Sequence, residues 1–148
     1  MNSLNAVSPV DGRYRSKCEP LAKFFSEGAL IKYRVRVEVE YFIALADRLK
    51  DMRPALAVVA SKADVLRDIY RQFTDDDAQA LKDIEKVTNH DVKAVEYFLK
   101  GKFDEIGLAE LKEFIHFGLT SQDINNTSVP LSMKECHDEV LLPTYKKI

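Results

Sequence analysis

The chain has 148 residues, enough for one domain whose core buries roughly 70% of the surface exposed by the unfolded chain. Its 22 Lys and Arg residues nearly balance 24 Asp and Glu residues, which gives no reason to expect a nucleic-acid partner. No apolar run approaches the roughly 18 residues of a membrane span and no signal peptide is evident, so we expect no membrane partner and a cytoplasmic location. Cys18 and Cys136 lie far apart without a CxxC motif, which favours reduced thiols over a zinc site or a disulfide.

Five glycines and five prolines are few for a chain of this length, which favours long helices and an all-α fold. The run 34–41 alternates polar and apolar residues like a half-buried strand. Apolar residues of the longer stretch 28–54 also share one helical face, and no turn signal interrupts them, so we predict a helix there. Two i,i+4 ion pairs would stabilise that helix by about 0.2–0.5 kcal/mol each: Arg34 with Glu38 and Arg36 with Glu40.

The next two helices have clear start signals. Pro54 suits a first helical turn, where its missing N–H has no intrahelical partner, and the apolar period continues to about Phe73. Thr74 is a predicted N-cap, because its hydroxyl can accept a first-turn N–H and the carboxylates of residues 75–77 oppose the positive helix end. This acidic run therefore favours a helix start over a metal site.

Two shorter helices are expected next. Asp91 can cap a helix that stops around Gly101. Another helix, from Leu108 to Phe117, ends at Gly118, a residue suited to the left-handed position after a helix.

The last predicted helix begins at Thr120, which has the spacing of a capping box with Asp123, and runs to the end of the chain. Pro130 would kink this helix unless the preceding residues form a separate turn. No Gly or Asn closes the helix before Ile148, which suggests that the natural protein continues.

Three polar segments carry more hydrogen-bonding groups than structural helices require. Segment 8–14, SPVDGRY, places the guanidinium of Arg13, which suits a phosphate, beside the phenol of Tyr14. Segment 88–92, TNHDV, places a histidine at a helix start, where free N–H groups and the helix dipole favour an anion. Segment 114–126, FIHFGLTSQDINN, places two hydroxyls at another helix start, as a carboxylate cradle would require. Each segment taken alone is also consistent with a surface loop or an ordinary cap.

Together the three segments resemble those of the adenylosuccinate lyases, members of the fumarase/aspartase superfamily, in their order and rough spacing. Argininosuccinate lyases and fumarases share only a segment like the third. The resemblance implies a helical enzyme that removes fumarate by β-elimination, from adenylosuccinate to give AMP and from the succinylated aminoimidazole carboxamide ribotide of purine biosynthesis. It also implies a homotetramer whose active sites combine several subunits, and we expect no cofactor.

Carried over by motif position, the resemblance implies substrate-binding roles for seven residues: Arg13, Tyr14, Asn89, His90, Asp91, Thr120 and Ser121. His116 matches a histidine close to the site and is given an accessory role at most. The family's general acid, a histidine in a Thr-His segment, and its general base, a serine on a Ser-Ser-x-Met-Pro loop, are absent from this sequence.

The resemblance therefore implies an amino-terminal fragment that is inactive alone. A helical domain is expected at 1–110 and the start of a central helical bundle at 111–148. The alternative hypothesis is a free-standing helical interaction module without catalytic activity.

Overall fold

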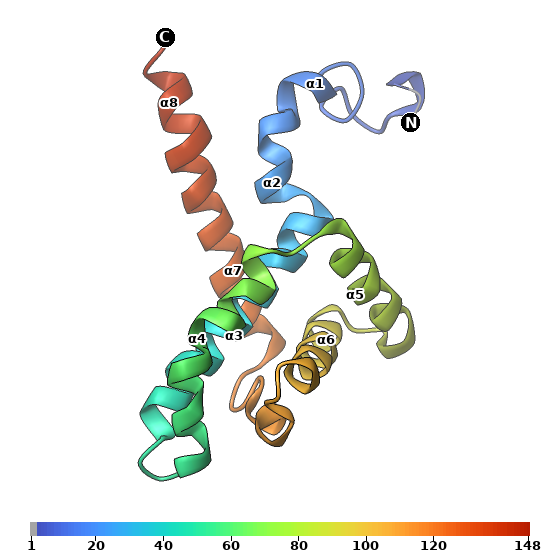
Figure 1. Ribbon diagram of the computed structural model, residues 1–148. Helices are drawn as coiled ribbons and strands as arrows, with labels where there is room; N and C mark the ends of the chain where they lie inside the picture. The colour runs from blue at the N-terminus through green and yellow to red at the C-terminus, as the bar shows by residue number, and fades with distance from the viewer. Residues whose placement is uncertain (1–2) are drawn as a thin grey trace.

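The computed structural model describes residues 3–148, and this part of the chain forms helices and no strand (Figure 1). The expected all-α fold is confirmed. The α-helices are α1 (Arg15–Cys18), α2 (Ala22–Phe25), α3 (Glu27–Leu49), α4 (Val59–Arg71), α5 (Asp75–Thr88), α6 (Asp91–Glu105), α7 (Ser121–Cys136) and α8 (Leu142–Tyr145). Four 3₁₀ segments cover Ser3–Asn5, Glu19–Leu21, Pro54–Val58 and Ala109–Phe114, and one π-helical turn covers His137–Leu141. Within residues 3–148 no helix has both the length and the hydropathy needed to cross a membrane.

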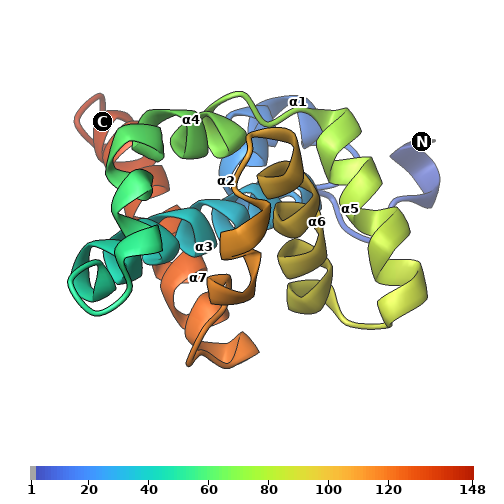
Figure 2. The same ribbon diagram turned by 60° about the horizontal axis from the view of Figure 1, so that its bottom comes forward.

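The long helix α3 is the element around which the other helices pack. It begins after Ser26, whose hydroxyl accepts the N–H of Ala29 at 3.1 Å. Helices α4, α6 and α7 all contact α3, and Figure 2 shows α3 running between α4 and α7. The predicted helix is therefore confirmed over the strand, and burial of α3 on several sides explains the alternating pattern of its sequence.

The charged residues in the middle of α3 pair with other segments, so the predicted i,i+4 ion pairs are wrong. Partly buried pairs between helices outweigh an exposed i,i+4 pair, which is worth only a few tenths of a kcal/mol. The observed pairs are Arg34–Asp91 (2.7 Å), Glu38–His116 (2.5 Å), Arg36–Glu135 (2.7 Å) and Glu40–Arg67 (2.9 Å). These contacts join α3 to α4, to α6, to α7 and to the loop before α7.

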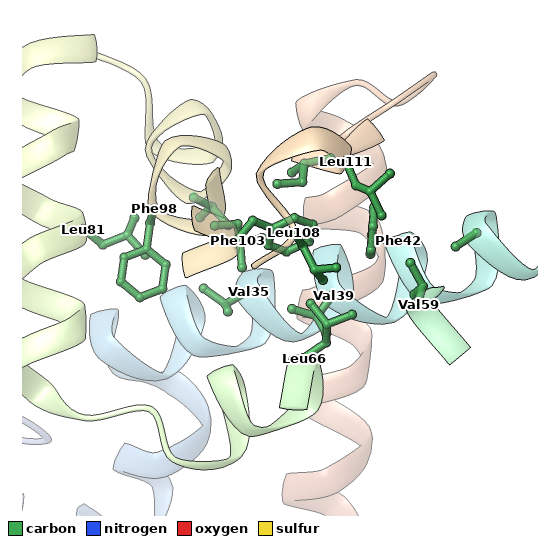
Figure 3. Packing of buried hydrophobic residues seen from close by; sticks show 14 of the residues in the cluster. Val35, Val39, Phe42, Val59, Leu66, Leu81, Phe98, Phe103, Leu108 and Leu111 are labelled. Carbon is green, nitrogen blue, oxygen red and sulfur yellow. The ribbon is translucent and has the colours of Figure 1, made fainter. Parts of the chain in front are cut away.

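A hydrophobic core fills the space between α3, α4, α5 and α6 (Figure 3). Phe42 on α3 meets Phe103 on α6 edge to face, with ring centroids 4.8 Å apart. Leu66 from α4 and Leu81 from α5 are no more than 1% exposed. Each fully buried side chain of this size contributes about 1.5–3 kcal/mol. This packing fixes α6 against α3 and so sets the position in space of the start of α6.

The predicted start of α5 is confirmed, whereas α4 begins at Val59, five residues after the predicted Pro54. Pro54 begins a 3₁₀ turn that leads into α4, which ends at Arg71, close to the predicted Phe73. The capping box of α5 is complete, because Thr74 N–H donates to the Asp77 carboxylate at 3.0 Å and Asp77 N–H donates to Thr74 Oγ1 at 3.3 Å. The acidic run is therefore a helix start, as predicted.

The start of α6 differs from the prediction by one residue. The N-cap is His90 and not Asp91, because His90 Nδ1 accepts the N–H of Lys93 at 3.1 Å. Asp91 is the first helical residue, and its carboxylate binds Arg34. Asp91, which local sequence reasoning assigned to the cap, thus pairs with Arg34 on the distant helix α3.

The end of α6 also differs from the prediction, since the helix passes through Gly101 and continues to Glu105. Leu99 and Phe103, on either side of this glycine, are each 1% exposed. Their burial outweighs the roughly 1 kcal/mol cost of a glycine inside a helix. The helix ends just before Gly107, which has a φ of +74°.

The segment between α6 and α7 is not the α-helix that was predicted for Leu108–Phe117. Only Ala109–Phe114 is helical, as a 3₁₀ segment, and Ile115 is extended. Ile115 is 4% exposed, so leaving the helix allows this side chain to enter the core. His116 follows with a φ of +60°, and Gly118 has a φ of +75°, which confirms the left-handed conformation predicted for Gly118.

Helix α7 begins as predicted at the Thr120–Asp123 pair. The Thr120 N–H and hydroxyl donate to the Asp123 carboxylate at 2.7 and 2.8 Å. The helix is not interrupted at Pro130. Pro130 offers no N–H to the carbonyl of Asn126, but both residues are exposed, so water can bind that carbonyl.

Candidate substrate-binding site

The starts of α6 and α7 meet and bring two of the three polar segments together. His90 Nε2 lies 3.3 Å from Ser121 Oγ. Because His90 Nδ1 accepts the N–H of Lys93, a neutral ring carries its proton on Nε2. That Nε2–H donates to Ser121 Oγ, so the hydroxyl proton of Ser121 is free to bind a ligand.

The surroundings of this contact suit an anion. The His90 side chain is 48% exposed, and Ser121 is partly exposed, so a ligand can reach both. The first N–H groups of a helix have no intrahelical partners, and the helix dipole adds partial positive charge at the same place. At the start of α6 the N–H groups of Val92 and Lys93 are already bound by Asp91 and His90. The start of α7 and the Ser121 hydroxyl therefore provide the donors that suit a carboxylate or a phosphate.

Thr120 and Ser121 are adjacent but differ in what they contact. Thr120 is exposed, and its hydroxyl and N–H both donate to Asp123, which closes the start of α7. These hydrogen bonds hold the pKa of Asp123 below its usual range. Ser121 takes no part in that cap, so of the two hydroxyls only that of Ser121 has its proton available.

A buried arginine joins the two helix starts to α3. Arg34 Nη2 lies 2.7 Å from Asp91 Oδ2, and Arg34 Nε donates to Asn125 Oδ1 on α7 at 3.0 Å. Burial favours the neutral acid of Asp91, but the N–H of Val92 and the charge of Arg34 outweigh it, and the pKa of Asp91 is lowered. Asp91 is thus an ionised residue that positions α6, and Arg34 keeps α6 and α7 in register.

Sequence reasoning missed Arg34 and Asn125. Arg34 was interpreted only as a local partner of Glu38, and Asn125 lies in the third polar segment without an assigned role. The available signal was a guanidinium inside an apolar helical run, because a charge at such a position requires a partner from another element.

His116 contacts a buried carboxylate on α3. Its Nδ1 lies 2.5 Å from Glu38 Oε1, and the Glu38 side chain is fully buried. Burial raises the pKa of Glu38, and the hydrogen bond from His116 opposes that shift. His116 lies close enough to the start of α7 that a proton on its ring favours the ionised form of Asp123 in the cap.

Asn89 is the residue after α5 and adopts the left-handed conformation, with a φ of +50°. It is exposed, and it turns the chain from α5 into α6. Asparagine tolerates this conformation better than most residues do. The geometry accounts for Asn89 as a turn residue beside His90, and a binding role for its amide stays a prediction.

Arg13 and Tyr14 are not brought to the meeting point of α6 and α7. Both side chains are exposed, and the Arg13 guanidinium lies over the Tyr14 ring at 4.5 Å from its centroid. They immediately precede α1, which lies apart from the starts of α6 and α7 in both views (Figures 1 and 2). The first polar segment is thus separate from the other two within this chain.

Comparison with known proteins identifies the family to which the chain belongs. A family profile described as Lyase matches residues 12–148, nearly the whole chain, and the chain belongs to this lyase family. Curated relatives are adenylosuccinate lyases: that of Dictyostelium discoideum is 55% identical over 99% of this chain, and that of Escherichia coli K12 is 48% identical over 100%. The adenylosuccinate lyase of Haemophilus influenzae is 45% identical over 100% of the chain.

The matches also show how much of those relatives the chain represents. It spans about a third of their length, 32% in each of these three cases. The predicted resemblance is therefore confirmed, and a free-standing interaction module is not favoured.

Proposed function

We propose that this chain supplies the substrate-holding part of an adenylosuccinate lyase, a carbon–nitrogen lyase of AMP biosynthesis. The whole enzyme releases fumarate from adenylosuccinate and from the succinylated aminoimidazole carboxamide ribotide. The names of relatives at 45–55% identity support the substrate class. The observation that carries the proposal is the meeting of His90 and Ser121 at 3.3 Å, with the proton of the serine free for a ligand.

The geometry at Ser121 fits the needs of β-elimination. Removal of a carbon-bound proton places developing negative charge on the neighbouring carboxylate of the substrate. A hydroxyl and helix N–H groups that face this carboxylate bind it more strongly in the transition state than in the ground state. Ser121 is the hydroxyl donor of this set, Thr120 holds the start of α7, and His90 and Asp91 hold the start of α6.

Arg13 and Tyr14 bind the phosphate of the nucleotide in this proposal. Their separation from Ser121 within one chain supports a homotetramer whose sites combine segments of different subunits, because a neighbouring copy would then supply the phosphate contact. The general acid and base are contributed outside this chain, since neither family motif occurs in it. The proposed division places the helical domain at 1–110 and the start of the central bundle at 111–148, in a cytoplasmic enzyme.

Fumarate release by the full-length protein tests the proposal. Adenylosuccinate, succinylated aminoimidazole carboxamide ribotide and argininosuccinate are offered separately, and fumarate is followed by its ultraviolet absorbance. We expect turnover of the first two and none of the third. Turnover of argininosuccinate alone would assign the chain to another branch of the lyase family.

A further inference from the structure

The pair formed by Glu38 and His116 has a structure that packing alone does not require. The Glu38 side chain is 0% exposed, and among residues 3–148 its ion-pair partner is the imidazole of His116, with no Lys or Arg beside it. Its second oxygen, Oε2, is a buried polar atom to which no described residue donates a hydrogen bond. An isolated buried carboxylate is costly, and an apolar residue of similar size would serve a purely structural position better.

The backbone at His116 points to the same conclusion. His116 adopts a left-handed conformation, with a φ of +60°, which residues with a Cβ atom rarely adopt. Strained backbone of this kind persists where surrounding contacts determine it. Here the left-handed turn brings the ring to Glu38 at the point where the chain approaches the start of α7.

The two ring nitrogens of His116 have different environments. Nδ1 faces Glu38 Oε1 at 2.5 Å. Nε2 has no hydrogen-bond partner among the described residues. Unlike Glu38 Oε2 it is not buried, so it is open to solvent. The hydrogen bond from His116 favours the ionised form of Glu38 against the effect of burial. An ionised carboxylate can only accept, so in this form of the pair Nδ1 carries a proton and donates it to Glu38 Oε1. The ring then has one fixed orientation, with Nε2 as its free nitrogen.

We propose that Glu38 is a positioning residue of the active site: it accepts the Nδ1 proton of His116 and so turns Nε2 toward the anionic ligand bound at the start of α7, to which the doubly protonated ring donates its Nε2–H. Glu38 itself touches no ligand, since its side chain is fully buried. The proposal rests on the proposed function for the identity of the ligand. It gives His116 a defined role and adds Glu38, which no sequence motif marks.

The first test is spectroscopic and needs no enzymatic activity. In the ¹⁵N-labelled chain, long-range ¹H–¹⁵N spectra of the histidine rings report which nitrogen carries the proton, and His116→Asn identifies the signals. We expect His116 to carry its proton on Nδ1 and to lose this fixed state in Glu38→Gln. A His116 ring without a proton on Nδ1 in the unaltered chain overturns the proposal, even if Glu38→Gln fails to fold.

The second test is kinetic and uses the full-length enzyme. Loss of a carboxylate that orients a metal-binding histidine typically costs roughly 10–100-fold. By analogy with that effect on histidine orientation, we expect kcat to fall by a similar factor in Glu38→Gln with a much smaller change in KM. Glu96→Gln is the matched control, because Glu96 is also buried near this junction but pairs with Lys93 and Lys100. We expect Glu96→Gln to retain kcat.

The outcomes of the two tests separate the two proposals. An unaltered enzyme that releases no fumarate from adenylosuccinate refutes the proposed function. In that case the ring-nitrogen spectra still test whether Glu38 holds the Nδ1 proton of His116. An active enzyme in which Glu38→Gln keeps kcat, or loses no more than Glu96→Gln does, overturns the positioning role alone.

Discussion

The roles of Thr120 and Ser121 can be separated by changing each to alanine in the full-length enzyme. Within the described part of the chain Ser121 Oγ makes one hydrogen bond, at 3.3 Å to His90, so its loss should cost about 0.5–1 kcal/mol of the free energy of unfolding. Thr120 Oγ1 donates to Asp123 at 2.8 Å within the cap, so Thr120→Ala should cost about 0.5–2 kcal/mol. If Ser121 binds the carboxylate that gathers charge, Ser121→Ala should lower kcat by roughly 10²–10³-fold, equivalent to about 2.7–4 kcal/mol.

Chemical denaturation and steady-state fumarate release measure the two quantities on the same samples. Ser61→Ala is the matched control, because Ser61 is an exposed serine in the first turn of α4 whose hydroxyl binds only the carbonyl of Val58. It should change neither kcat nor stability by much. If Thr120→Ala lowers kcat more and Ser121→Ala lowers stability more, the cap and the carboxylate contact have been assigned to the wrong residues.

Four further predictions concern the isolated chain, Arg13, Arg34 and the two cysteines. The 148-residue chain alone should release no fumarate from adenylosuccinate, because the proposed acid and base are absent; steady turnover by the purified chain would refute this. In the full-length enzyme, Arg13→Ala should weaken binding of both substrates by roughly 1.5–3 kcal/mol, because both carry the same phosphate, and an unchanged KM for both would exclude that role. Arg34→Met should lower the free energy of unfolding by about 1–3 kcal/mol, because it removes the partner of Asp91. The lowered pKa of Asp91 contributes stability above about pH 4, and this stability is lost as the pH falls through that pKa. The free energy of unfolding of the variant should therefore fall less on acidification than that of the unaltered enzyme. Cys18 and Cys136 are free thiols, so reductant should leave the melting temperature unchanged.

The helix starts were predictable because their chemistry is local. The capping boxes at Thr74 and Thr120 each involve residues three positions apart, and both form as their spacing indicates. Gly118 is left-handed for an equally local reason, since glycine has no Cβ atom to oppose a positive φ. Features of this kind need no knowledge of the rest of the fold.

Predictions that involved competing partners failed where a distant residue decided the outcome. Asp91 was the predicted cap of α6, but its carboxylate pairs with Arg34, 57 positions earlier in the chain, and His90 forms the cap instead. Gly101 would end a helix judged by propensity alone, but burial of Phe103 beyond it extends α6. Local preference is worth about 1 kcal/mol in such cases, less than the burial of one large side chain.

The sequence by itself determined the helical class, the capped starts of α5 and α7 and, through its motifs, the lyase family to which the chain belongs. Only the tertiary structure decided which polar residues meet: His90 with Ser121, 31 positions apart, and Glu38 with His116, 78 positions apart. It also showed that Arg13 lies away from both pairs. Periodicity and capping report on residues within a turn or two of each other, whereas contacts between helices depend on how their apolar faces pack, and the core around α3 sets that geometry.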